Sequence, residues 1–165
     1  MTILTNVPSV LNTKHPFLIG LEKRHAQTLL EGAKEEEFQA GEIIFREGEP
    51  ADSFYLIETG TVVLESHCPN NGNVQIQTLH DGDALGWSWL FEPFAWNFQA
   101  RAAKPTRVIR CDGGHLLVTV EEDEHFGHEL MKRIAHLAVQ RLQAARKLLV
   151  QAQSVLNKGS ASPRN

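Results

Sequence analysis

The sequence predicts a mostly β domain with flanking helices (α+β), built as a double-stranded β-helix or jelly roll and followed by one long helix. Short apolar runs separated by glycines between residues 37 and 111 predict the strands, and the apolar spacing after residue 124 predicts the helix. The 165 residues suit one domain with an appended element. We divide the chain into an N-terminal arm (1–15), a β-roll with short helices (16–123), a long helix (124–156) and a disordered tail (157–165).

The first expected element is a short helix between Pro16 and about Ala33. Apolar residues and one histidine recur near helical spacing in this segment. They are Phe17, Leu18, Leu21, His25, Leu29 and Leu30.

The stretch from Glu37 to about Cys111 has the pattern of an all-β sandwich, barrel or jelly roll. Its apolar runs, such as EIIF, FYLI and TVVL, are short, and glycines recur every 4–12 residues. The NNGN run at Asn70–Asn73 predicts a hairpin, because Asn and Gly tolerate positive φ. After this stretch, Asp112 is the expected N-cap of a short helix that contains Leu116, Leu117 and Val120.

The long helix carries two apolar stripes. One is a heptad seam with alternating steps of four and three residues, which we expect to pack against the same helix of a second copy. Its residues are Met131, Ala135, Ala138, Leu142, Ala145, Leu149, Ala152 and Leu156. The second stripe, expected to pack on the β-roll, contains Leu130, Ile134, Leu137 and Leu148. Two stripes on one helix require two partners, so the sequence predicts a homodimer.

Composition and charge exclude several function classes. The chain is 42% hydrophobic and 22% charged, and it lacks both a membrane-length apolar run and a signal-peptide core, so we expect a cytoplasmic protein without a membrane partner. Cys68 and Cys111 stand far apart, which excludes a disulfide framework or a zinc knuckle. The sequence has neither a nucleophile elbow nor a P-loop, and we expect no enzyme activity.

Three glycine-containing motifs and one short Ala-Arg-Ala motif follow one another through the β region. They are Phe38-x-x-Gly41-Glu42-x-Ile44-Phe45, Tyr55-x-Ile57-x-x-Gly60-x-Val62, Leu79-x-x-Gly82-Asp83-x-x-Gly86 and Ala100-Arg101-Ala102. This pattern resembles the cyclic nucleotide-binding domain of the catabolite activator protein family. The resemblance implies a β-roll, a long dimerising helix and a ligand site at the phosphate-binding cassette, the segment that follows Gly86.

The cassette departs from the family pattern at both of its polar anchors. The resemblance implies a glutamate for the ribose at the position of Trp87 and an arginine for the phosphate at the position of Trp96. Arg101 has the opposite strand parity to Trp96, so we do not expect it to substitute. Without the arginine, a cyclic phosphate would lose a charge-assisted contact.

Aromatic residues replace the missing anchors. Six of the chain's 12 aromatic residues, including all three tryptophans, lie between Trp87 and Phe98. Two interpretations stay open: the rings fill the old pocket as core, or they line a pocket for an apolar or aromatic effector. The candidate ligand-binding residues are Gly86, Trp87, Ser88, Trp89, Leu90, Trp96 and Asn97.

The transcription factors of this family carry a helix-turn-helix domain after the long helix, whereas only nine residues follow Leu156. We therefore expect no sequence-specific DNA binding. No resident cofactor or metal is expected, because His125, His128 and His136 lack a further ligand nearby.

The sequence thus predicts a stand-alone regulatory sensor with altered ligand choice, passing its signal to an unknown protein partner. Two alternatives stay open: a genuine cyclic AMP or cyclic GMP binder, and a ligand-free interaction scaffold with a filled pocket.

Overall fold

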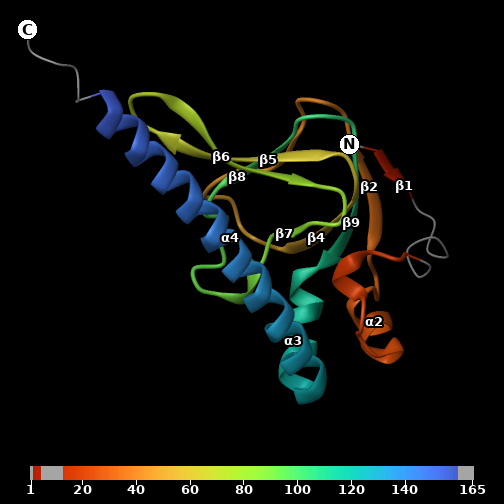
Figure 1. Ribbon diagram of the computed structural model, residues 1–165. Helices are drawn as coiled ribbons and strands as arrows, with labels where there is room; N and C mark the ends of the chain where they lie inside the picture. Colours follow the sequence, from red (N-terminus) through yellow and green to blue (C-terminus); the bar gives the residue numbers. More distant parts are fainter. Residues whose placement is uncertain (1, 5–12, 160–165) are drawn as a thin grey trace, which may run out of the picture.

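Two antiparallel sheets form the body of the protein in the computed structural model, which describes residues 2–4 and 13–159 (Figure 1). The first sheet has the strand order β1-β2-β9-β4-β7 and the second the order β3-β8-β5-β6. The strands are β1 (Thr2–Leu4), β2 (Lys34–Phe38), β3 (Ile43–Phe45), β4 (Ser53–Thr59), β5 (Thr61–Cys68), β6 (Gly72–His80), β7 (Ala84–Leu85), β8 (Gln99–Ala102) and β9 (Thr106–Asp112). This arrangement confirms the predicted jelly roll with its long final helix.

The core lies between the two sheets and under the helices. Strand β4 pairs with β9 on one side and with β7 on the other, and its residues Phe54, Leu56 and Ile57 are fully buried. Val62 and Leu64 of β5 bring apolar side chains to the same core from the second sheet. The FYLI and TVVL runs therefore lie on interior strands of the two sheets.

The predicted hairpin at Asn70–Asn73 joins β5 to β6. Gly72 has a φ of +67°, and the ladder runs from the Cys68–Gly72 pair to the Thr61–His80 pair, with an irregularity between Leu64 and Glu65. A glycine at this point lets the chain turn without the steric cost that a Cβ would impose at positive φ.

The N-terminal helical region is split into two, so the single helix expected between Pro16 and Ala33 is wrong. A 3₁₀ helix, η1 (Pro16–Leu18), is followed by α2 (Lys23–Leu29). Gly20 lies between them with a φ of +74°, a conformation that breaks helix geometry. Apolar spacing could not reveal this break, because buried side chains of both pieces continue the same periodic pattern.

The predicted short helix is α3 (Gly113–Glu122), and Asp112 is its N-cap. The Asp112 carboxylate accepts a hydrogen bond from the His115 backbone N–H at 2.8 Å. This bond satisfies one of the amide groups that have no partner within the helix.

Replacement of Asp112 by alanine is expected to lower the free energy of unfolding by about 1 kcal/mol, the usual cost of losing an N-cap side chain. Asp112→Asn, which keeps an acceptor oxygen, should recover most of that loss. Urea unfolding followed by circular dichroism measures both variants. An alanine variant as stable as the wild type would contradict the capping role.

Helix α4 (Glu124–Gly159) runs along one side of the β-roll (Figure 1) and continues three residues beyond the expected end at 156. The remainder of the expected tail lies outside the described residues. The two predicted stripes differ in burial. Leu130 and Ile134 are buried and Leu137 packs against the core, whereas Leu148, the last residue of that stripe, is exposed.

Among the described residues, the heptad seam of α4 packs on the core only at its first residue. Met131 packs against the core, but Ala135, Ala138 and Ala145 are exposed, and Leu142 and Leu149 are 70% and 63% exposed. In a helix of 36 residues, about 54 Å long, this leaves an apolar stripe in contact with solvent.

Candidate effector site

The segment between β7 and β8 contains every predicted ligand-binding residue. It begins at Gly86, whose φ is +88°. A Cβ there would approach the Ser53 carbonyl oxygen to 3.0 Å and the Trp96 ring to 3.1 Å. The chain therefore needs glycine at this point both for its backbone conformation and for the close approach of Trp96.

Trp96 closes the space next to Gly86. Its side chain is 3% exposed and stacks on Phe45 of β3, with ring centroids 3.9 Å apart and planes inclined by 16°. Tyr55 of β4 adds a tilted contact at 6.4 Å. The position expected to carry the phosphate-binding arginine is thus occupied by an indole that is packed between the two sheets and Gly86.

Trp89 points to a different part of the core. It belongs to the 3₁₀ helix η2 (Ser88–Leu90), is 2% exposed and packs on Gly113 at the start of α3. A Cβ at Gly113 would lie 2.8 Å from the Trp89 ring. The buried Nε1 of Trp89 has no hydrogen-bond partner within the described residues. Trp89 therefore joins the cassette to α3 and does not share a cavity with Trp96.

Trp87 lies at the contact between the cassette and α4. It is half-buried, and the Arg141 guanidinium carbon lies 5.6 Å from the centre of its ring, a cation–π contact. Arg141 also donates a hydrogen bond to the Ala84 carbonyl oxygen, and burial lowers the pKa of Arg141 to about 10. The position expected to carry the ribose-binding glutamate thus holds α4 against the cassette.

The polar candidates lie near one another but form few bonds. Ser88 is buried, and its hydroxyl oxygen lies 3.5 Å from the exposed Asn97 side-chain nitrogen, the limit of a hydrogen bond. Leu90 is half-buried against the core. The structure therefore brings Ser88 and Asn97 together, while Trp87, Trp89 and Trp96 lie against α4, α3 and the sheets, respectively.

The loop after η2 is fixed by backbone bonds to the segment after β3. The Trp96 carbonyl oxygen accepts a hydrogen bond from the Gly48 backbone N–H at 2.8 Å, and the Trp96 N–H donates to the Glu49 carbonyl oxygen at 2.9 Å. The Phe94 carbonyl oxygen accepts from the Ala51 N–H at 2.7 Å. Phe94 has a φ of +54°, which is rare for a bulky residue and persists only where neighbouring contacts enforce it. The cassette is thus a constrained loop and not an open flap.

Arg101 does not replace the missing phosphate-binding arginine, as its strand parity predicted. Its guanidinium forms an ion pair with Glu65 on the neighbouring strand β5, and Gln99 donates to the same carboxylate at 2.8 Å. The Arg101 hydrogen bond and charge lower the pKa of Glu65. Arg101 is therefore held by an ion pair between two strands of the sheet.

Replacement of Glu65 by glutamine is expected to lower the free energy of unfolding by about 1–2 kcal/mol at neutral pH, because Arg101 loses its charged partner. A lowered carboxyl pKa stabilises the fold above its ordinary value of 4.5, and that stabilisation is lost as the pH falls through the folded-state pKa. Urea unfolding from neutral pH to about pH 3 should therefore show the two proteins converging in acid. A difference that does not change with pH would contradict this role.

Three residues of the site were not among the sequence-based candidates. Phe45 and Tyr55 supply the rings on which Trp96 packs, and Arg141 supplies the contact to Trp87. Phe45 and Tyr55 did belong to the glycine-containing motifs, so their positions carried a signal for the fold but none for the stack.

Residues 35–123 match the family model of the cyclic nucleotide-binding domain. The match covers more than half of the chain, and the chain belongs to this family. The resemblance noted in the sequence is therefore confirmed.

Curated relatives include regulatory proteins. A cAMP-dependent protein kinase regulatory subunit from Schizosaccharomyces pombe is 35% identical over 97 residues, which are 59% of this chain and 23% of the relative. A CRP-like cAMP-activated global transcriptional regulator from Mycobacterium tuberculosis is 22% identical over 116 residues, 70% of this chain and 52% of the relative. The chain thus spans between about a quarter and a half of the length of these two relatives.

Solved structures share the fold over most of the chain. A cyclic nucleotide-binding domain from Methylobacillus flagellatus superposes with a TM-score of 0.80 at 16% identity, covering 92% of this chain and 88% of that one. The sensor domain of the transcriptional regulator DNR from Pseudomonas aeruginosa gives a TM-score of 0.64 at 19% identity, covering 83% and 92%. At these identities the likeness shows the fold.

None of the helices within residues 2–4 and 13–159 combines the length and apolar character needed to cross a membrane. Nor do those residues contain a group of three or more His, Cys, Asp or Glu side chains that could hold a metal ion.

Proposed function

We propose that this chain is a homodimeric regulatory module whose cassette has lost the ordinary contacts to a cyclic nucleotide and is altered in its choice of effector. The observation that supports this proposal is the stack of Trp96 on Phe45 beside Gly86. It places an apolar ring where a cyclic phosphate would need a cation.

A cyclic nucleotide would lose the arginine contact to its phosphate in this cassette. A hydrogen-bonded arginine–phosphate pair is among the strongest polar contacts in proteins, and an indole offers one N–H and no charge. A cyclic nucleotide would also have to displace Trp96 from a buried stack, which costs the packing that the ring makes with Phe45 and Tyr55. An effector that is apolar or aromatic suits this segment better.

The exposed seam of α4 supports the proposed homodimer. The seam has the heptad spacing of a two-helix coiled coil, and the core-facing stripe beside it anchors the helix to the β-roll. A second copy of α4 would cover Leu142 and Leu149, two leucines of the predicted interface that are more than 60% exposed.

The contact between Trp87 and Arg141 gives an effector a route to the dimer. If the effector binds segment 86–98 more tightly in one conformation of the protein than in another, it increases the population of the conformation that it prefers. Because Arg141 contacts both Ala84 and Trp87, a change at Trp87 alters how α4 is held on the β-roll. Helix repacking across the two-fold axis would then present a different surface to a protein partner.

Native mass spectrometry of the purified protein tests this function, with tryptophan fluorescence as a second readout. The proposal predicts a dimer that retains a small molecule, and a change of fluorescence when that molecule is removed. All three tryptophans lie within or beside the cassette, so occupancy should alter their emission. A dimer that carries no bound small molecule, and whose tryptophan fluorescence does not change when metabolites are added, would contradict the proposal of an effector.

A second candidate is a ligand-free interaction scaffold. The face-to-face Phe45–Trp96 stack favours it, because a buried aromatic stack is a stable core in its own right. The same experiment separates the two candidates, since a scaffold would dimerise without any bound molecule.

A further inference from the structure

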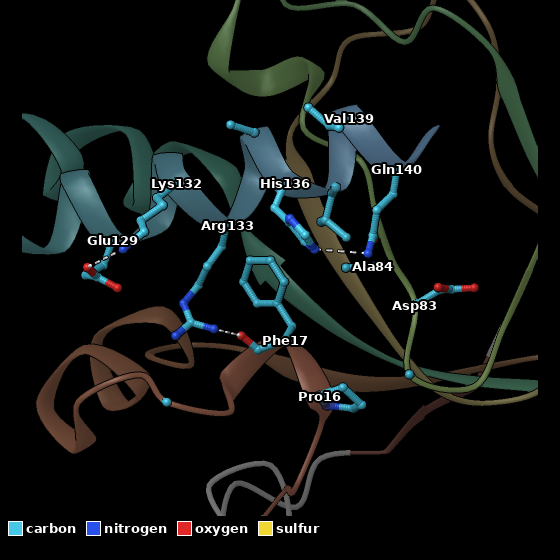
Figure 2. Close-up of a pocket in the computed structure, with 14 residues that line it drawn as sticks. Pro16, Phe17, Asp83, Ala84, Glu129, Lys132, Arg133, His136, Val139 and Gln140 are labelled. Carbon is cyan, nitrogen blue, oxygen red and sulfur yellow. Dashed lines mark hydrogen bonds and ion pairs between the residues drawn. The ribbon is translucent and has the colours of Figure 1, made fainter. Parts of the chain in front are cut away.

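A groove lies between α4 and the N-terminal part of the domain, outside the cassette (Figure 2). Its volume is about 840 Å³, within the range of small-molecule sites. One wall is α4, and the other is formed by η1 and by the turn Gly82–Ala84. That turn leads directly through β7 into Gly86.

The groove lies on a flank of α4 that the proposed dimer leaves free. At 100° per residue, Arg133, His136 and Gln140 lie together on one side of the helix, roughly opposite Leu142 and Leu149 of the seam. Only the rim of the groove, at Ala135, reaches the seam. A ligand could therefore enter the groove of each subunit in the dimer.

The α4 wall carries one guanidinium, that of Arg133, without a carboxylate partner within the described residues. The Arg133 guanidinium donates to the backbone carbonyl oxygens of Phe17 and Ile19 at 2.7 and 3.0 Å. Within the described residues it has no ion pair with a carboxylate, and its buried Nε has no hydrogen-bond partner. Lys132, one residue away, has only the half-buried Glu129 at 4.0 Å.

The other polar groups of the groove are His136 and Gln140 on α4 and Asp83 on the opposite wall. The Nε2 atom of His136 lies 3.0 Å from the Gln140 side-chain nitrogen, which donates to it in the tautomer that carries its proton on Nδ1. Figure 2 shows Asp83 on the opposite wall, where its carboxylate accepts from the His80 backbone N–H. The cations thus gather on α4, and the single facing acid is already bonded.

The remaining surface of the groove is apolar. Phe17 points between the two walls in Figure 2, and Pro16 and Leu137 extend the same surface. An apolar floor with a cationic rim suits a molecule that has an apolar body and an anionic head.

We propose that this groove binds an organic acid, with its carboxylate or phosphate at Lys132 and Arg133 and its apolar body on Phe17 and Leu137. Such a ligand would tie α4 to the turn that precedes the cassette, and would act on the same helix as the effector from a separate site. The inference does not depend on what the cassette binds.

Isothermal titration calorimetry with benzoate and with phenyl phosphate tests the proposal, and the probe that binds more tightly identifies the head group. We expect saturable binding of one molecule per chain, with at least tenfold weaker affinity in the Lys132→Gln/Arg133→Gln variant. Lys132→Gln alone, at an exposed position, should weaken binding without any risk to folding. Arg146→Gln/Lys147→Gln is the matched control, since it removes two cations of α4 that lie outside the groove.

Amide shifts in nuclear magnetic resonance spectra locate the bound probe. The proposal predicts saturable shifts at Phe17, Ala84 and Leu137 and none specific to residues 88–97. It is overturned if neither probe binds at concentrations up to about 10 mM. It is equally overturned if the shifts map to the cassette, or if the control variant loses as much affinity as the groove variant.

Discussion

Replacing Leu142 and Leu149 by aspartate is expected to convert the proposed homodimer into monomers. Both side chains are more than 60% exposed on α4 and carry no contact that the β-roll needs. Burying each leucine in a helix interface contributes about 1.5–3 kcal/mol, so losing two per chain, four per dimer, should weaken the dimer at least about 10⁴-fold. Charged carboxylates facing each other across the two-fold axis add repulsion.

Sedimentation equilibrium measures this effect, and Val150→Asp is the matched control. Val150 is 60% exposed and apolar, but it is turned about 100° around the helix from Leu149. The control should stay dimeric, and circular dichroism should show that both variants keep α4. A seam variant that remains dimeric at micromolar concentration would exclude α4 as the interface.

Trp96→Ala is expected to cost about 3–5 kcal/mol of folding free energy, the usual range for truncating a buried aromatic side chain. The ring is 3% exposed and packed against Phe45, Tyr55 and Gly86, so its removal leaves a cavity between the sheets. Trp96→Phe should lose much less, because it keeps an aromatic face for Phe45.

Urea unfolding followed by far-ultraviolet circular dichroism measures the Trp96 series. Phe91→Ala serves as the control within the same segment, since Phe91 is 58% exposed and should change stability by no more than about 0.5 kcal/mol. If Trp96→Ala cost as little as Phe91→Ala, the indole would be a removable lid and the pocket would be open.

Local signals in the sequence were enough to predict the fold. Gly72 and Gly86 stand at turns with positive φ, and Asp112 caps α3, because each of these features depends on a few adjacent residues. The break at Gly20 was missed because a turn of a few residues does not interrupt apolar spacing.

The sequence predicted which segment forms the candidate site, but not which residues its side chains contact. The replacement of two polar anchors by Trp87 and Trp96 could be read from residue order, whereas their partners could not. Phe45 and Arg141 lie 51 and 54 residues from these tryptophans in the chain, and only the packing of β3 and α4 brings them together. Three tryptophans in one segment therefore meet three different surroundings.

The most direct test of the account is a calorimetric titration of the purified, extensively dialysed protein with cyclic AMP and with cyclic GMP. Since Trp96 fills the space beside Gly86 and Glu65 holds Arg101, we predict no saturable binding of either nucleotide in the cassette up to about 1 mM. Micromolar binding of one molecule per chain, with amide shifts in residues 86–98, would contradict the account and would show that this cassette holds a cyclic phosphate without its arginine.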